Sequence, residues 1–201
     1  MTSISHIPEP LLDAARDCML AVGIRRTTLT DIARRAGVSR MTVYRKVDDV
    51  DTLLLAVVTR EFSALVLAAE AAARELPTAR ERLVATAARV IARLPAEPLF
   101  RRVVDVDPEL FLPYVTERFG STQRIAQGHV RRLLHEGLVD GSVAGCDPES
   151  RAWTVVVALT AFALSRPLLE RAMGEAVVEE EVRQMLDRWL SPATPERRPR
   201  R

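Results

Sequence analysis

One short run of the sequence brings together side-chain types that suit the reading of DNA. Arginine can form two hydrogen bonds to a guanine, a threonine hydroxyl can bond a base or a phosphate, and methionine can contact a thymine methyl group. Arg40, Met41 and Thr42 come first in this run, where a short helix can approach the major groove. Tyr44 and Lys46 lie to the sides and suit phosphate contacts. The run therefore indicates a DNA-reading helix.

The charge of the surrounding segment supports this interpretation. Residues 23–47 contain seven basic side chains against Asp31 alone, a net charge of +6, whereas residues 48–62 contain one basic and four acidic side chains, a net charge of −3. The whole chain carries only +2 and uses arginine throughout, with Lys46 as its one lysine. The local imbalance, rather than the number of arginines, is what favours a polyanionic partner.

A first helix is predicted from Glu9 to Val22, ahead of this run. Pro10 suits its first turn, and Gly23 ends it. An apolar stripe with helical spacing indicates the face that packs inward, with Cys18 and Leu12 beside it; the stripe consists of Leu11, Ala15, Met19 and Val22.

Two short helices follow. Thr28, with Asp31 three residues later, is a capping pattern for a second helix that Gly37 ends after two turns, with Leu29, Ile32, Ala33 and Ala36 facing inward. Ser39 caps a third helix from Arg40 to Val47, and Val38 and Val43 are expected to pack back on the second. Two short helices separated by Gly-Val-Ser indicate a helix-turn-helix.

The remaining chain also reads as helical. Prolines at 95, 98, 108 and 113 divide residues 95–114 into short pieces, glycines at 137, 141 and 145 indicate a loop, and Pro167 is expected to interrupt a helix. Helices are predicted over residues 51–74, 77–94, 121–136, 148–165 and 175–190.

The run TTLTDIARRAGVSRMTVYRKV, with LLDAARDCMLAVGI before it and DTLLLAV after it, resembles the N-terminal domain of tetracycline-repressor (TetR) family regulators. The resemblance implies an all-α chain with an N-terminal three-helix helix-turn-helix domain over residues 1–50. A C-terminal helical ligand-binding and dimerisation bundle covers 51–190. We expect residues 191–201 to form a disordered basic tail.

The resemblance also implies roles for individual residues. Thr28 caps the second helix and touches phosphate, Thr30 lies where a base-reading residue sometimes occurs, and Tyr44 matches a phosphate-contacting tyrosine. The full set of expected DNA contacts is Thr28, Thr30, Ser39, Arg40, Met41, Thr42, Tyr44, Arg45 and Lys46.

The flank of the motif departs from the family pattern. Val47 replaces a common phenylalanine, which is expected to reduce a core contact, and Val50 replaces a frequent phosphate-binding lysine. Aspartates at 48, 49 and 51 crowd the same place and should repel DNA. We hypothesise that Lys46 supplies the missing phosphate contact.

The resemblance further implies a repressor that a small, apolar effector releases from a palindromic operator of double-stranded DNA. Candidate effector contacts are Phe100, Phe111, Tyr114, Trp153 and Phe162, for each of which core packing is the alternative. A homodimer is expected through helices near 121–136 and 148–165. The second of these is apolar nearly all round and must be buried, either in that interface or in a central core.

Other chemistry is weakly represented. Asp105, Asp107 and Glu109 suit a helix start better than a cation site or a carboxylate pair, and His129 and His135 face different sides of a helix. We expect no catalytic site, metal or cofactor, so the chain is not expected to be an enzyme.

Two cysteines without a disulfide framework favour the cytoplasm, and no apolar run approaches the length of a membrane span, the longest being Val155 to Leu164. A helical small-molecule-binding or enzymatic protein with a purely structural N-terminal bundle, and a DNA-binding regulator without an effector, remain the alternatives.

Overall fold

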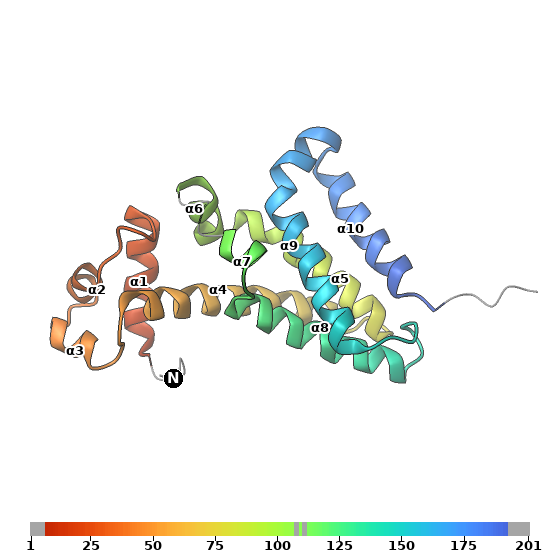
Figure 1. The fold of residues 1–201 in the computed structure, drawn as a ribbon, viewed down its shortest axis with the longest axis horizontal. Helices are drawn as coiled ribbons and strands as arrows, with labels where there is room; N and C mark the ends of the chain where they lie inside the picture. The colour runs from red at the N-terminus through yellow and green to blue at the C-terminus, as the bar shows by residue number, and fades with distance from the viewer. Residues whose placement is uncertain (1–6, 107–108, 110–111, 193–201) are drawn as a thin grey trace, which may run out of the picture. The chain divides into compact units, whose positions relative to one another are not determined.

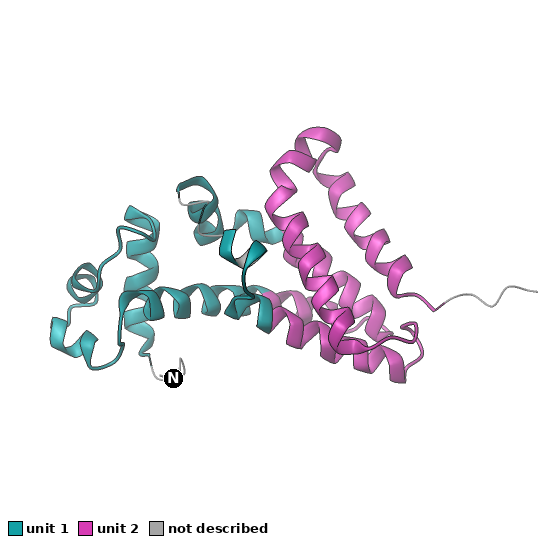
Figure 2. Ribbon diagram, in the orientation of Figure 1, with its two compact units in different colours: residues 1–65, 93–124 teal, residues 66–92, 125–201 magenta. Residues whose placement is uncertain are grey.

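The computed structural model describes residues 7–106, 109 and 112–192, and the regular structure in these residues is entirely helical (Figure 1). The chain divides into two compact units (Figure 2). Unit 1 comprises residues 1–65 and 93–124, and unit 2 comprises residues 66–92 and 125–201. The predicted tail lies outside the described residues from position 193 onward.

Unit 1 begins with α1 (Glu9–Val22), whose bounds are as predicted, with Pro10 in the first turn. Leu11, Ala15 and Met19 are buried, as the apolar stripe predicted. The prediction for Val22 is wrong, because its side chain is 40% exposed. Val22 is the last residue of the helix, and the chain leaves the helical conformation at Gly23, where φ is 90°.

Helices α2 (Leu29–Arg35) and α3 (Arg40–Tyr44) form the helix-turn-helix. Gly37, with φ of 68°, allows the Val38 amide to donate to the Ala33 carbonyl at 3.0 Å, the bond that closes a Schellman turn. The third helix ends three residues earlier than predicted. Beyond Tyr44 the Lys46 amide donates to the Val43 carbonyl three residues back, which tightens the last turn.

The core of unit 1 is built from α1, α2, α3 and the start of α4 (Val50–Ala73). Leu29, Ile32 and Ala33 are buried as predicted, with Ala36 partly buried against the same cluster. Val43 is fully buried, whereas Val38 is exposed, so only one of these two valines packs back as expected. Val47 is also buried in this core, and Val50 packs against it.

Short helices complete unit 1, as the prolines predicted. They are the 3₁₀ helix η2 (Leu94–Ala96), α6 (Pro98–Val106) and α7 (Leu112–Thr116). Leu99 of α6 joins the core around α1, and the Arg102 guanidinium donates to the Ala21 carbonyl at 3.4 Å. Helix α6 therefore packs against the end of α1.

Unit 2 contains the end of α4, most of α5 (Ala79–Arg93) and of α8 (Ser121–Val139), and then α9 (Pro148–Met173) and α10 (Glu175–Leu190). Gly137, predicted to begin a loop, lies inside α8. A Cβ there would lie 2.3 Å from the Val143 side chain. Glycine at this position therefore permits a close approach rather than a turn.

Pro167 does not interrupt α9, contrary to the prediction. The preceding Arg166 is 1% exposed, and it donates to Glu170, to Glu175 and to the carbonyl of Ile91 on α5. These contacts hold the helix on both sides of the proline, so the one backbone hydrogen bond that proline cannot donate does not break it.

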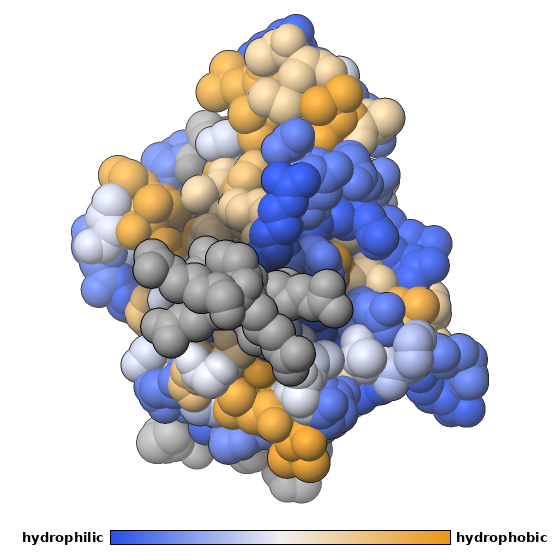
Figure 3. Space-filling model, turned by 90° about the vertical axis from the view of Figure 1, so that its right-hand side faces the viewer, coloured by the Kyte–Doolittle hydropathy of each residue, from blue (hydrophilic) through white to orange (hydrophobic). Residues whose placement is uncertain are grey.

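Helix α9 is not wholly buried within one chain, so the central-core alternative does not account for all of its apolar surface, and the dimer interface stays a prediction. Val155 and Val156 are buried, but Val157 is 50% exposed. Figure 3 also shows apolar side chains over the α9–α10 turn, where Leu168 and Met173 are exposed. An apolar surface of this kind indicates a partner or a ligand.

Helices α4 and α9 are long and apolar enough to cross a membrane by length and composition alone. The sequence prediction considered uninterrupted apolar runs and therefore missed this. A core helix of a globular protein passes the same test, and α4 contributes Leu53, Leu54 and Val57 to the core of unit 1. The absence of a membrane partner remains a prediction.

Candidate DNA-binding site

Residues 40–46, which form α3 and the turn after it, have one buried side chain, and the others are exposed or half-buried. Val43 is fully buried, whereas Arg40, Arg45 and Lys46 are exposed and Met41 is 70% exposed. Tyr44 is 56% exposed. The structure therefore brings the predicted reading residues together on the outer side of α3.

Ser39 and Thr42 form the cap of α3. The Ser39 hydroxyl accepts a hydrogen bond from the Thr42 amide at 3.1 Å, and the two hydroxyl oxygens lie 2.9 Å apart. One hydroxyl proton is used between them, so the other remains free to donate. The pair can thus cap the helix and still offer one donor to a phosphate or a base.

Thr28 caps α2 in a more closed arrangement. Its hydroxyl accepts from the Asp31 amide at 3.2 Å and donates to the Asp31 carboxylate at 2.6 Å. A phosphate would have to displace Asp31 to receive that proton, a competition that the sequence pattern did not reveal. Thr30 is half-buried on the same helix.

The basic residues of the segment fall into two groups. Three are paired: Arg25 with Glu109 at 3.0 Å, Arg34 with Asp31 at 2.7 Å and Arg35 with Asp17 at 3.4 Å. Among the described residues, no ion pair forms from Arg26, Arg40, Arg45 or Lys46. The positive charge available to a polyanion is therefore concentrated on and just after α3.

The acidic flank has a structural use. The Asp49 carboxylate accepts from the Thr52 amide at 2.6 Å and so caps α4. This hydrogen bond holds the pKa of Asp49 below its usual value. Val50, where the family often has lysine, packs against the core instead of facing outward. This helix start therefore presents no lysine, and the chain's one lysine, Lys46, precedes it by four residues.

The candidate effector contacts are spread over both units. Phe100 is half-buried in unit 1, whereas Trp153 and Phe162 are half-buried in unit 2, where Phe162 packs against the core. Phe111 and the side chain of Tyr114 lie outside the described residues. These residues give no shared site that can be described.

The groups considered for other chemistry have structural partners or lie apart. His129 lies 2.9 Å from the Glu70 carboxylate, which also accepts from Arg132. His135 is exposed, Glu109 pairs with Arg25, and Asp107 lies outside the described residues. In the described parts of the chain, no group of three acidic, histidine or cysteine side chains is placed to hold a metal ion.

Fold and site together define a DNA-binding protein of the helix-turn-helix class, and comparisons place it within that class. The family model for bacterial regulatory proteins of the tetR family matches residues 11–57. An uncharacterised HTH-type transcriptional regulator of Mycobacterium bovis is 31% identical over 90% of this chain and 92% of its own length. The chain belongs to the TetR family of helix-turn-helix transcriptional regulators.

Solved structures show the same fold. The transcriptional repressor QsdR of R. erythropolis, from the TetR family, matches with a TM-score of 0.66 at 21% identity, over 94% of this chain and 96% of QsdR. RolR in complex with the ligand resorcinol matches with a TM-score of 0.66 at 17% identity, over 92% of this chain and 87% of RolR. At these identities the likeness concerns the fold alone.

Proposed function

We propose that the chain represses transcription by reading a palindromic operator as a homodimer, and that a small molecule bound in its helical body releases it. The observation that carries the DNA-reading part is the exposed surface on and just after α3, where Arg40, Arg45 and Lys46 have no ion pair with any described residue. The proposed contacts are those predicted from the sequence, from Thr28 to Lys46, in a domain of residues 1–50. Residues 51–190 form the proposed body.

DNA binding is tested with the fragment upstream of the chain's own gene. Fluorescence anisotropy at two salt concentrations separates specific from electrostatic binding, because counterion release makes the latter fall steeply with salt. We expect binding to the labelled fragment to survive an excess of unrelated DNA. Equal competition by the unrelated DNA at both salt concentrations would contradict sequence reading of this fragment.

The exposed apolar surface of α9 supports the homodimer. Helices α8 and α9 are proposed to pair with their counterparts, because a single helix-turn-helix reads only half of a palindromic site. Val157→Glu places a charge on the exposed part of α9, and sedimentation should show a shift from dimer to monomer. Val177→Glu, on the exposed side of α10, should stay dimeric. Loss of the dimer in both variants, or in neither, would contradict this assignment.

The ligand-dependent step is proposed by comparison with RolR, whose structure contains resorcinol. Resorcinol and larger apolar phenols are suitable first probes, added to the preformed complex of protein and labelled DNA. Release of DNA must be matched by weaker binding of the probe to the DNA-bound protein, since the coupling is reciprocal. A compound that releases DNA without this reciprocal loss would not act as proposed.

A further inference from the structure

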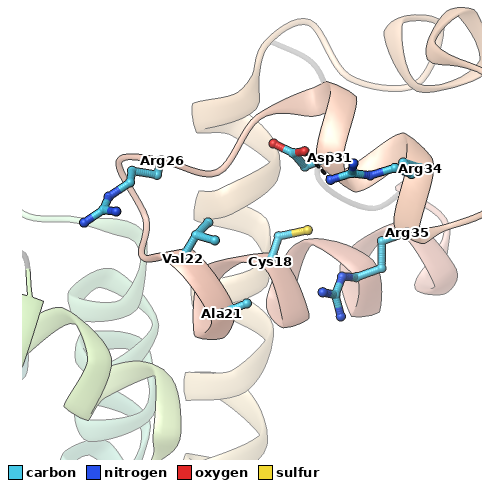
Figure 4. Close-up of a pocket in the computed structure, with 7 residues that line it drawn as sticks. All are labelled: Cys18, Ala21, Val22, Arg26, Asp31, Arg34 and Arg35. Carbon is cyan, nitrogen blue, oxygen red and sulfur yellow. Dashed lines mark hydrogen bonds and ion pairs between the residues drawn. The ribbon is translucent and has the colours of Figure 1, made fainter.

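An open hollow of about 480 Å³ lies between α1 and α2, within unit 1 (Figure 4). Its volume falls in the range of sites that hold small molecules. Helix α1 supplies the apolar part of the wall, and α2 with the turn before it supplies the charged part. The lining residues are Cys18, Ala21, Val22, Arg26, Asp31, Arg34 and Arg35.

The charges of the hollow favour an anion. Figure 4 shows the Cys18 sulfur directed into the space between the Asp31–Arg34 pair and Arg35, whereas the Arg26 guanidinium points away from the other side chains. Arg35 makes a long contact of 3.4 Å to Asp17, which does not line the hollow, and a hydrogen bond to the Cys18 thiol. With Arg26 directed away, Arg34 and Arg35 stand against Asp31, the one lining carboxylate, so the wall keeps an excess of positive charge.

The floor is neutral and apolar. Burial raises the pKa of the Cys18 thiol, although the charge and hydrogen bond of Arg35 act in the opposite direction. The thiol is therefore uncharged at neutral pH and contributes, with Ala21 and Val22, a surface on which an apolar body can lie.

We propose that this hollow binds a small organic anion with a flat apolar body, whose carboxylate lies between Arg34 and Arg35. The proposal assigns a second ligand site to the DNA-reading unit, separate from the effector site proposed for the helical body. Guanidinium groups suit this task because they bind carboxylates with paired hydrogen bonds.

The occupant would also weaken operator binding, a consequence that rests on the proposed DNA site. Asp31 connects the hollow to the proposed DNA site, because its carboxylate pairs with Arg34 at 2.7 Å and accepts a hydrogen bond from Thr28 at 2.6 Å. An anion that draws Arg34 away changes the cap of α2, where Thr28 is proposed to meet phosphate. We expect operator affinity to fall about fivefold, with the same factor for the anion in the DNA-bound protein.

Binding itself is tested without DNA, with 2-naphthoate as the probe and the uncharged 2-naphthamide as its isostere. Alkylation of the two cysteines by N-ethylmaleimide, followed by mass spectrometry, gives an internal reference because Cys146 does not line the hollow. We expect 2-naphthoate to protect Cys18 but not Cys146, with half-protection at about 1 mM or below. Equal protection by 2-naphthamide, or none by either compound, would overturn the proposal.

Two variants locate the site on the full chain. Ala21→Phe fills the hollow from an exposed position, and Arg35→Gln removes one charge; each should weaken protection by 2-naphthoate roughly tenfold. Arg26→Gln makes the same change in net charge with a side chain that points away, and should have a smaller effect. Equal loss in both glutamine variants would show attraction to net charge and overturn the site. These measurements contain no DNA, so a variant that loses operator binding but keeps protection of Cys18 would count against the proposed DNA site and not against the hollow.

Discussion

Two groups of basic side chains in unit 1 differ in whether they form ion pairs within the chain. Between α1 and α4, Arg60 binds the carboxylates of Glu9 at 2.7 Å, Asp13 at 2.8 Å and Glu61 at 2.9 Å, and Arg16 binds Glu61 at 2.8 Å. Burial alone would lower the pKa of Arg60, but the hydrogen bonds to these carboxylates raise it overall. On α3, by contrast, Arg40 has no ion pair with any described residue.

The difference shows that residue type does not decide what an arginine does. Helix α1 presents acidic side chains to α4, so the arginines there join the two helices. No carboxylate of the described residues pairs with the outer side of α3, so its cations stay hydrated until a polyanion arrives. The first group belongs to folding, and the second is available for binding.

The largest expected effect is on operator reading. Arg40→Ala should reduce discrimination between the operator and a site with one altered base pair by about 1–3 kcal/mol, roughly 5- to 150-fold. Thermal stability should change by no more than about 0.5 kcal/mol, because the side chain is exposed and has no ion pair. Anisotropy with matched and altered sites measures the first quantity. A large loss of stability would show that Arg40 contributes to folding as Arg60 does, which contradicts the distinction between the two groups.

The next effect concerns stability. Arg60→Met leaves Glu9 and Asp13 without their cation, whereas Glu61 keeps Arg16. It should lower the free energy of unfolding by about 2 kcal/mol, between the values for exposed and buried ion pairs. Urea denaturation measures it. The salt dependence of DNA binding should not change, since Arg60 already has its partners. A reduced salt slope would show that Arg60 contacts DNA phosphate, as proposed for the basic residues of α3.

A smaller effect is expected at Lys46. Lys46→Ala should weaken operator binding and reduce the slope of log affinity against log salt by about 0.9, the value for one phosphate contact. Lys46→Arg keeps the charge and should retain most of the slope. If affinity and slope both stay unchanged in the alanine variant, Lys46 does not replace the lysine that Val50 lacks.

The smallest effect extends the comparison to unit 2. Burial acts to raise the pKa of Glu136, but hydrogen bonds from Arg132 and Arg82 lower it overall. Its contribution to stability is present above the unfolded value of 4.5 and is lost as pH falls through the lowered folded value. Glu136→Gln should therefore destabilise the protein at pH 7 and progressively less below about pH 4.5. Glu181→Gln is an exposed control, and the difference in stability between this variant and the original chain should not depend on pH in this way.

Local signals predicted the elements that depend on neighbours in the sequence. The bounds of α1 and α10, the caps at Thr28 and Ser39, and the turn at Gly37 were all predictable, because each depends on residues within one or two turns.

Features set by distant contacts were not predictable. The continuity of α9 through Pro167 depends on the buried Arg166 and its bond to Ile91, 75 residues away. Among the basic residues near the motif, Arg34 has a carboxylate three positions before it, which the sequence shows, but Arg35 pairs with Asp17 across the fold. The count of +6 therefore overstated the charge available for DNA.

The exposed position of Lys46 has a chemical consequence. Because it is the chain's one lysine, any reagent or enzyme that acylates lysine side chains can modify this protein at a single position. Acylation there removes one of the cations that α3 and its following turn keep unpaired. A lysine-containing peptide that carries one acyl group would thus report the charge state of the proposed DNA-facing surface.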